Sequence, residues 1–582
     1  MHFPYAPSAR PDGAFFVPDP PSGHGRIGSV NRLPLVVALG IPLVAVAIYL
    51  AGLVLVPPGA RTTPSGPALA AGGSPTVTAT PGSLSSPAPT VASASPSGAA
   101  PSPSPSGPIE GPLADVPIVP VAQYRTTVEL IARADVRAAL AGTSLTWDDL
   151  ELVADEADAI LAGLGVKRPA GDAHLVLAAD AGHLAADLAA HRKHLGVLRA
   201  DAVGPSVRAL GWGTRRLFGV DAAKSGAAWG LTARLPQPVG IPVFDPGASW
   251  TLVAGGDIML DRGVAQTIKI RGKGVDFPFD GGTADITGHT CCSAFGWRVP
   301  TVVRSGGAGA MRHLVSAADI AIANFENPAP DQFRYHTSGT VFSADPKLIA
   351  GLAHAGIDWV GIANNHIGDA GGTGILQTIA NLRTRGIAAS GAGKNLAAAR
   401  KPTILGASGT KVAFLAYDTI AKTYAAGPNR AGSAQMSAKV VRQDVVAARK
   451  AGARVVIVFP HWGTEYDPTP FAGQQALARA AIDAGADIVI GNHAHWAGAM
   501  EVYHGKPIWY ALGNFVFDQT WSEPTMEGIT LELTFRGAAL VQARMRPHVI
   551  LDKSQPNFLD PAGDGRVVMG QIFDASKGKL PW

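Results

Sequence analysis

The sequence predicts an α/β fold, with a small α/β domain followed by a larger one. Two observations predict it. From residue 249 onward, short apolar runs rich in β-branched residues alternate with helical segments, and this alternation is typical of a helix-covered, largely parallel sheet. The chain also has 582 residues, which is too long for a single hydrophobic core, so two or more domains are expected.

The N-terminal part predicts a membrane anchor. Residues 1–32 are polar and rich in Pro and Gly, as in a disordered cytoplasmic tail. Residues 33–56 carry no charge over 24 positions, which is long enough for a transmembrane helix. The alternative is a cleaved signal peptide, whose apolar region is usually shorter and begins earlier. Three arginines precede this stretch and only Arg61 follows closely. The N-terminus is therefore expected in the cytoplasm and the remaining chain outside it, at the cell membrane.

A linker and a small domain follow the predicted helix. Residues 57–115 are mostly Pro, Ser, Ala, Thr and Gly, as in an extended spacer. Residues 116–245 are expected to form a small α/β accessory domain, with a strand at 173–178 and helices at 147–164 and 181–195. Part of this domain, 196–219, resembles periplasmic solute-binding domains, but no ligand motif accompanies it.

The larger domain is predicted over residues 249–550, with a C-terminal tail at 551–582. Its predicted strands are 250–255, 319–323, 358–363, 411–416, 454–459, 486–490 and 507–512. Three of them follow a helix that closes with Ala-Gly, and the glycines Gly356, Gly452 and Gly485 suit a left-handed helix end.

Charge and cysteine content narrow the function classes. The net charge of +4 gives no case for a nucleic-acid surface. The two cysteines, Cys291 and Cys292, are adjacent, which excludes a disulfide framework, and two free thiols are expected because adjacent cysteines bond only through a strained ring. They lie in an irregular, glycine-rich insert at 271–309, which is interpreted either as a surface loop or as a lid.

Polar side chains cluster where the predicted strands end. Ligands of open α/β sheets bind beyond the carboxyl ends of the strands. The residues at those ends are Asp257, Asn324, Glu326, Asn364, Asn365, His366, Asp369, His461, Glu465, His493, His495 and Asn514. Individually, such residues also serve as helix caps, turn residues or core histidines. Their coincidence at successive strand ends favours a metal or polar-ligand site.

The donor types indicate which metals such a site would take. Carboxylates, amides and imidazoles without cysteine suit Mn²⁺, Fe²⁺ or Zn²⁺, bound as one ion or as two sharing a carboxylate. Arg262, Asn364 and Asn514 are expected to contact substrate. The alternative for Arg262 is a solvated helix arginine, and the alternative for Asn364 is a turn residue.

Taken in order, these motifs resemble the bacterial CapA family, which is associated with poly-γ-glutamate capsule biosynthesis and belongs to the calcineurin-like metallophosphoesterase superfamily. The resemblance covers roughly residues 250–520 and rests on the following series: Gly256-Asp257, Asn324-x-Glu326, Asn364-Asn365-His366-x-x-Asp369, His461-x-Gly463-x-Glu465, His493-x-His495 and Leu512-Gly513-Asn514-Phe515.

The resemblance implies a four-layer α/β/β/α sandwich with a metal site at its top. The implied metal ligands are Asp257, Glu326, Asn365, His461, His493 and His495, and His366 is the implied catalytic acid or oxyanion donor. One ligand departs from the superfamily pattern. The first motif is Asp-x-His there, whereas Ile258 and Met259 follow Asp257 here. One metal position is then a ligand short, so a substitute ligand or a single ion is possible.

Three function hypotheses remain open. The first is an anchored extracytoplasmic metallohydrolase that acts on a phosphoester, amide or ester linkage of a cell-surface polymer. The second is a non-enzymatic protein that binds, exports or tethers an anionic polymer such as poly-γ-glutamate, together with membrane proteins of capsule synthesis. The third, a solute receptor built on 116–245, rests on the least sequence support.

Overall fold

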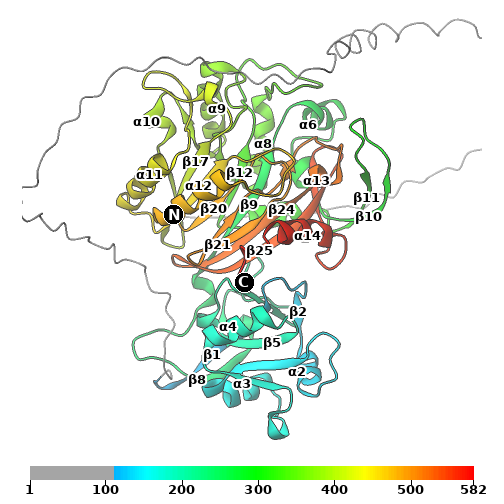
Figure 1. Ribbon diagram of the computed structural model, residues 1–582, viewed down its shortest axis with the longest axis vertical. Coiled ribbons are helices and arrows are strands. Elements are labelled where there is room, and N and C mark those ends of the chain that lie inside the picture. The colour runs from blue at the N-terminus through cyan, green and yellow to red at the C-terminus, as the bar shows by residue number, and fades with distance from the viewer. Residues whose placement is uncertain (1–109) are drawn as a thin grey trace, which may run out of the picture. The chain divides into compact units, whose positions relative to one another are not determined.

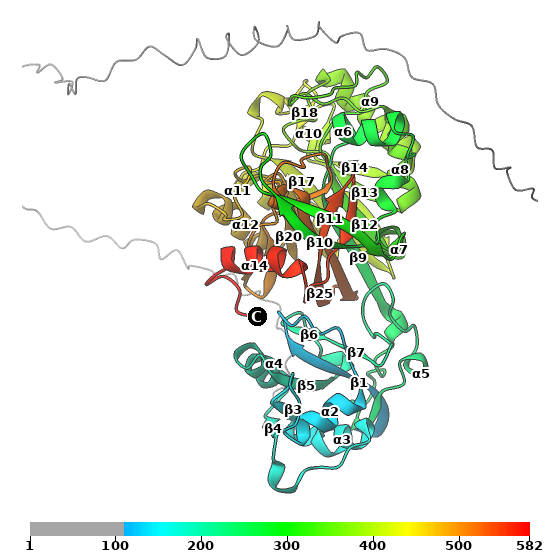
Figure 2. The ribbon, with the colours of Figure 1, turned by 90° about the vertical axis from the view of Figure 1, so that its right-hand side faces the viewer.

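The computed structural model describes residues 110–582 (Figures 1 and 2). The tail predicted at 1–32, the membrane helix predicted at 33–56 and the linker up to residue 109 lie outside these residues. Within 110–582, every helix is too short or too polar to cross a bilayer.

The first part of the described chain forms a six-stranded sheet with its own hydrophobic core. Its strand order is β4-β3-β5-β1-β6, and β8 also pairs with β1. The bounds are β1 (Leu113–Gln123), β3 (Asp149–Val153), β4 (Leu175–Ala178), β5 (His194–Arg199), β6 (Val207–Ala209) and β8 (Thr232–Pro236), with helices α2 (Arg133–Leu140), α3 (Ala157–Leu164), α4 (Ala181–Ala190) and α5 (Gly226–Trp229). A short pair, β2 (Leu130–Ile131) and β7 (Gly211–Trp212), completes it.

One predicted helix of this part is wrong in its first half. Residues 147–164 were expected to be a single helix, but 149–153 form β3, and α3 begins only at Ala157. Strand β3 pairs in parallel with both β4 and β5, so it lies inside the sheet. Tertiary pairing therefore overrides the helical pattern there.

Two further sheets form the larger part of the molecule. The ten-stranded sheet contains β9 (Ser249–Ile258), β10 (Thr283–Thr290), β11 (Val299–Gly306), β12 (Ile320–Phe325), β13 (Trp359–Gly361), β14 (Ala388–Ser390), β23 (Asn514–Val516), β24 (Glu527–Arg536), β25 (Ala539–Leu551) and β26 (Gln555–Phe558). The six-stranded sheet contains β16 (Thr403–Ala407), β17 (Thr410–Asp418), β19 (Val455–His461), β20 (Ile488–Ile490), β21 (Met500–Tyr503) and β22 (Lys506–Trp509). All seven strands predicted from apolar runs are therefore present.

The two sheets pack face to face. Trp359 of β13 stacks on Phe414 of β17, with ring centroids 4.9 Å apart, and meets Phe459 of β19 edge-on at 5.2 Å. These rings belong to one buried cluster that draws residues from both sheets. Such aromatic pairs contribute about 0.5–1.5 kcal/mol each beyond their buried area.

Helices cover the two outer faces, so the layers run helix, sheet, sheet, helix (Figure 1). Helix α8 (Ile349–Ala355) packs Ile349 and Leu352 into a cluster with Phe325 of β12. On the other side, α11 (Ala438–Lys450) packs Val441 into a cluster with Val456 of β19. The remaining helices are α6 (Arg262–Ala265), α7 (Ala310–Ser316), α9 (Gly371–Thr384), α10 (Leu396–Ala399), α12 (Ala472–Asp483), α13 (Glu523–Met526) and α14 (Gly565–Ala575).

Strand direction brings the predicted polar residues to one edge. Strands β9, β12, β13 and β14 run parallel in the large sheet, and β17, β19, β20 and β22 run parallel in the other. The helices leading into them end as predicted, because Gly356, Gly452 and Gly485 have φ values of 89°, 92° and 100°. The chain therefore re-enters each sheet in the same direction.

Three expectations about the edges of this domain need correction. The insert at 271–309 is not irregular throughout, because β10 and β11 form an antiparallel hairpin at the edge of the large sheet (Figure 2). Cys291 and Cys292, in its loop, form a disulfide rather than two free thiols. The expected tail at 551–582 contains β26, which pairs with β25, and helix α14.

Candidate metal centre

The parallel strands of both sheets carry polar residues to a common point. The register places Asn324 of β12 beside Asp257 of β9, and Glu326 directly follows β12. From the other sheet, His461 ends β19 and His493 follows β20. All of these side chains are buried.

Two groups of three side chains at this point have ligand atoms within 4.8 Å of one another. The first contains Glu326, His461 and His493. His461 Nε2 lies 3.3 Å from Glu326 Oε1 and 3.1 Å from His493 Nδ1. Asn365 joins this group, because its Oδ1 lies 2.7 Å from the same His461 Nε2.

The second group contains Asp257, Glu326 and His495. His495 Nδ1 lies 3.5 Å from Asp257 Oδ2, and His495 Nε2 lies 4.0 Å from Glu326 Oε1. Glu326 thus belongs to both groups. The six implied ligands are therefore brought together, and they lie around a shared carboxylate as the family resemblance implies.

Glu326 provides the test of whether these residues fit a metal. Its side chain is fully buried, and neither carboxylate oxygen has a hydrogen-bond partner within the described chain. An unpaired buried carboxylate is costly, by several kcal/mol in general, unless it is neutralised or coordinates a cation. Together with the imidazoles and carboxylate around it, this side chain fits a divalent ion.

The electrostatics of the metal-free centre follow from burial. Burial raises the pKa of Asp257 to about 7. Burial, and then the Asp257 charge, raise the pKa of Glu326 well above its usual range. Burial also lowers the pKa of His493 to about 4 and those of His461 and His495 well below the usual value. The imidazoles are therefore neutral and ready to ligate, whereas the carboxyls must release protons to a metal.

His493 and His495 reach the centre through unusual backbone geometry. Their φ values are 92° and 57°, in the left-handed region that side-chain-bearing residues rarely adopt. Each such residue costs of order 1–3 kcal/mol and persists where the surroundings enforce it. The packing around the loop after β20 therefore holds both histidines in a strained backbone conformation.

His366 lies at the rim with its orientation fixed. Its Nδ1 is 3.0 Å from Asp369 Oδ2, and its ring packs against Phe342 with centroids 4.1 Å apart. Asp369 is held in turn by the Phe342 amide and the Tyr424 hydroxyl. The His366 side chain is 12% exposed, so it remains accessible. With Nδ1 bound to Asp369, Nε2 is the ring nitrogen left for a ligand.

Asn364 and Asn514, which were predicted to contact substrate, make hydrogen bonds within the protein instead. Asn364 is buried, donates to the Phe325 carbonyl and accepts from the His366 amide. The Asn514 Oδ1 pairs with His495 Nδ1 at 2.9 Å, and its amide donates to Gln519 and to the Thr525 carbonyl. Both side chains therefore position ligands and strand ends, which leaves them no free group for a substrate.

Arg262 matches neither of its two interpretations in full. It is buried rather than solvated, and its guanidinium pairs with Asp518 at 2.5 Å and donates to the Gly339 carbonyl. It also lies over the Phe342 ring, 4.8 Å from its centroid. Its Nε is buried and has no hydrogen-bond partner among residues 110–582, so one donor remains beside the ring that packs on His366.

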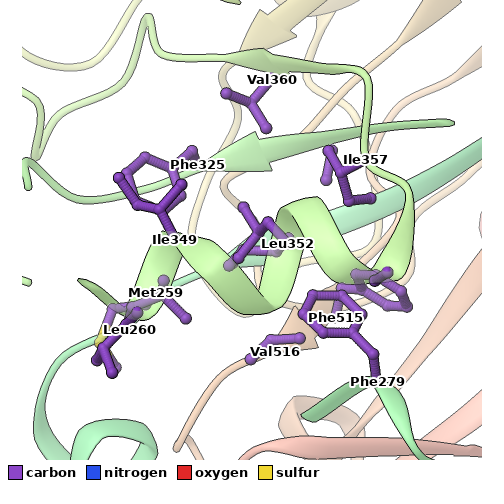
Figure 3. Close-up of a cluster of buried hydrophobic side chains, with 14 of the residues drawn as sticks. Met259, Leu260, Phe279, Phe325, Ile349, Leu352, Ile357, Val360, Phe515 and Val516 are labelled. Carbon is purple, nitrogen blue, oxygen red and sulfur yellow. The ribbon is translucent and has the colours of Figure 1, made fainter. Parts of the chain in front are cut away.

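Met259 stands where the resemblance implies the histidine of the first motif, and it is part of the hydrophobic core. Met259 is buried in the same cluster as Ile349 and Leu352 of α8, where Figure 3 shows it. Its side chain therefore contributes to the hydrophobic layer beneath the sheet. The Asp257 group therefore lacks the histidine that the resemblance described above would imply at position 259.

Sequence reasoning missed three residues that hold the centre. Asn324 donates to Asp257 Oδ1 at 2.7 Å, Asp369 orients His366, and Asp518 pairs with Arg262. The first two were noticed at strand ends but given no function. The spacing indicated both, because Asn324 lies two residues before Glu326, which directly follows β12, and Asp369 lies three residues after His366. Asp518 lies 256 positions from Arg262, and no local pattern links them.

Comparison with known proteins places this site in a family. The family model described as "Bacterial capsule synthesis protein PGA_cap" matches residues 251–519. The chain is 30% identical over 284 residues to a Mycobacterium tuberculosis (strain ATCC 25618 / H37Rv) protein named "Probable polyglutamine synthesis accessory protein", covering 46% of this chain and 74% of that one. The chain belongs to the CapA family.

Two relatives carry the CapA name. The capsule biosynthesis protein CapA of Bacillus anthracis is 32% identical over 281 residues, which is 45% of this chain and 66% of that protein. The PGA biosynthesis protein CapA of Bacillus subtilis (strain 168) is 33% identical over 237 residues, 40% of this chain and 59% of that protein. This chain thus spans less than two thirds of the length of these two CapA proteins.

Solved structures give weaker similarities. The NAD nucleotidase of Haemophilus influenzae is 13% identical with a TM-score of 0.29, covering 55% of each chain. A 5′-nucleotidase precursor of Thermus thermophilus is 12% identical with a TM-score of 0.31, covering 56% of this chain and 58% of that one. Neither similarity is close enough to assign an activity to this CapA-family protein.

The Glu326→Gln variant tests the shared ligand. It should lose metal uptake, measured by elemental analysis after removal of metal and reloading with Mn²⁺ or Zn²⁺, because glutamine supplies no negative charge between the two groups. At neutral pH the metal-free variant should unfold at a higher temperature than the metal-free parent, because the raised pKa of the buried Glu326 carboxyl costs stability that an uncharged amide does not cost. Asp285→Asn, which changes an exposed carboxylate of β10 outside both groups, should alter neither quantity. Full metal content in Glu326→Gln would contradict the assignment.

Metal affinity should rise as the pH rises from about 5.5 to about 8. Binding needs ionised carboxyls, and each proton released raises the affinity by up to about tenfold per pH unit below that group's pKa. The contribution of Asp257 levels off above its pKa of about 7. Competition with a chromophoric chelator across this pH range measures the slope, and a flat or falling affinity would exclude the carboxyls as ligands.

The metal-free protein should show the opposite trend in stability. The folded-state pKa of Asp257 lies above its ordinary value of 3.8, so its contribution is full at low pH and is lost as the pH rises through about 7. Thermal unfolding of the metal-free Asp257→Asn variant should lack this part of the decline.

Proposed function

We propose that this protein binds one or two divalent ions at the Asp257–Glu326–His495 and Glu326–His461–His493 groups and acts on an anionic cell-surface polymer. One observation supports the metal above all others: the shared Glu326 carboxylate is buried, and within the described chain neither of its oxygens accepts a hydrogen bond. A cation between the two groups would satisfy it without any rearrangement of the fold.

The donor set selects the class of metal. Asp257 and Glu326 offer oxygen, Asn365 offers an amide oxygen, and the three histidines offer nitrogen, with no sulfur ligand among them. Hard and borderline ions such as Mn²⁺, Fe²⁺ and Zn²⁺ suit this mixture. When bound, such ions lower the pKa of a coordinated water and polarise a phosphoryl or carbonyl oxygen.

His366 is the residue of this chain that we assign to proton transfer. Asp369 holds its Nδ1, which leaves Nε2 as the ring nitrogen for a ligand. From there it would donate a proton to a leaving oxygen, or a hydrogen bond to a developing oxyanion. The Phe342 ring packs against the His366 ring, and Arg262 lies over Phe342 in turn. The reaction class proposed is hydrolysis of a phosphoester, amide or ester linkage.

The names of the relatives support a proposal for the polymer. Proteins of Bacillus anthracis and Bacillus subtilis that match this chain are named for capsule and PGA biosynthesis. We therefore propose a role in the synthesis, export or anchoring of poly-γ-glutamate or a similar anionic polymer, in company with membrane proteins of capsule synthesis.

A non-enzymatic role is the second candidate, and one observation favours it. Met259 occupies the motif-one position and is committed to the core, so the Asp257 group has fewer ligands than a full dinuclear site. A single ion held by Glu326, His461 and His493 would then bind the carboxylates of a polymer without cleaving it.

The His366→Ala variant separates the two candidates. A metal-reconstituted screen against phosphoesters and γ-glutamyl polymers identifies a substrate, and the variant should then lose about 10²–10⁴-fold in kcat while its metal content stays unchanged. His354→Ala, which changes an exposed histidine paired with Asp276, is the matched control. Unchanged turnover in His366→Ala would remove the residue from this role. Polymer binding without turnover on any substrate would support the non-enzymatic candidate.

We also propose that residues 33–56 anchor the protein with its folded domains outside the cytoplasm. The proposal is supported by the uncharged 24-residue stretch and by the arginines before it. Protease added to intact spheroplasts should degrade the folded part, and a chain lacking 33–56 should appear in the soluble fraction. Protection of the C-terminus in intact cells, with degradation after lysis, would reverse the proposed orientation.

A further inference from the structure

A second group of metal-type ligands lies outside the centre described above, in the first sheet. Asp187 is in the last turn of α4, His191 caps that helix, and His194 begins β5. Helix α4 and strand β5 lie side by side (Figures 1 and 2). The three side chains have ligand atoms within 4.8 Å of one another.

Asp187 brings the two imidazoles together. Its Oδ1 lies 3.0 Å from His191 Nδ1, and its Oδ2 lies 2.9 Å from His194 Nδ1. The two rings stack with their centroids 4.6 Å apart. Ligand atoms around a tetrahedral zinc are about 3.3 Å apart, given bonds of about 2.0–2.1 Å. The two Asp187–imidazole separations are somewhat shorter than that value, as hydrogen bonds are, so binding of an ion would require side-chain rotations that replace these hydrogen bonds with bonds to the metal.

A buried carboxylate faces the same point from the neighbouring strand. Glu151 of β3 is 1% exposed, and its Oε2 lies 3.4 Å from His194 Nδ1. Asp149, on the same strand, has Oδ2 3.4 Å from His194 Nε2. Three carboxyls thus have oxygens within 3.4 Å of the nitrogens of one imidazole, and carboxylate oxygen with imidazole nitrogen is a donor set that a borderline divalent ion takes.

The surroundings favour a cation and give it access. The carbonyl end of α4 carries partial negative charge, which stabilises cations at that end. The flanking basic side chain of Lys193 is engaged by Asp148 at 3.4 Å. The side chains of His191 and Asp187 are 54% and 32% exposed, so an ion can enter from solvent.

We propose that Asp187, His191 and His194 bind one divalent transition-metal ion of the Zn²⁺ class, with Glu151 as the fourth ligand. This site shares no residue with the Asp257–Glu326 centre. It links the end of α4 to β3 and β5, so the bound ion cross-links a helix to two parallel strands. The competing arrangement is a hydrogen-bonded His–Asp–His set that holds no ion.

Counting ions in the full chain, purified without a histidine tag, tests the proposal. The Asp257→Asn, Glu326→Gln double variant empties the main centre and isolates the second one. After metal removal and reloading with Zn²⁺, it should retain one zinc per chain by elemental analysis. Adding His191→Ala, whose side chain is exposed, should weaken binding by at least about tenfold. Adding Glu151→Gln should weaken it in the same direction.

His183→Ala is the matched control, since His183 lies on the same helix but pairs with Asp180. It should leave zinc binding unchanged. The proposal is overturned if the double variant binds no zinc, or if His191→Ala and His183→Ala bind it equally well. Failure of the main centre would show as unchanged zinc content between the parent and the double variant, so the two proposals fail separately.

Discussion

The face-to-face packing of the two large sheets is the constraint from which the main centre follows. Trp359 contacts Phe414 and Phe459 across the sandwich, which fixes the separation of the sheets. Because the central strands of each sheet run parallel, their carboxyl ends open at the same edge. Carboxylates arrive there from one sheet and most of the imidazoles from the other, so neither sheet alone contains a complete ligand set.

The fold was largely predictable because its strands are continuous apolar runs with glycine-ended helices before them. The same logic failed at 147–164, where the helical pattern of α3 was extended back over β3, a strand defined by its neighbours in the sheet. It failed again at β10, a strand of the 271–309 insert, which pairs with β26 more than 250 residues further along the chain through Thr283 and Phe558. Pairing partners distant along the chain leave no local pattern.

The candidate site shows a similar division. The candidate ligands at or directly after strand ends were recognised, because their position alone predicted them. Asp257, Glu326 and His461 indeed converge. Their supports were not recognised. Asn514 and Asn364 were expected to meet substrate, yet both spend their hydrogen bonds on strand ends and on His495 or His366. Whether a polar side chain faces inward or outward depends on tertiary contacts that spacing does not encode. The group of Asp187, His191 and His194 was missed for a related reason. Its third ligand, His194, lies beyond the end of α4 at the start of β5, so helical spacing does not link it to the other two.

The backbone conformation of His493 and His495 sets the ligands of this site against the stability of the fold. Both residues hold a conformation that glycine adopts without cost and that asparagine tolerates. Replacing either histidine by glycine would release strain in the loop and would remove an imidazole. The metal-free fold would then become more stable, and the centre would lose a ligand. Selection for a sturdier fold alone would therefore erode this loop. The strain at His493 and His495 is therefore a stability cost that accompanies the placement of two imidazoles at this edge of the sheets.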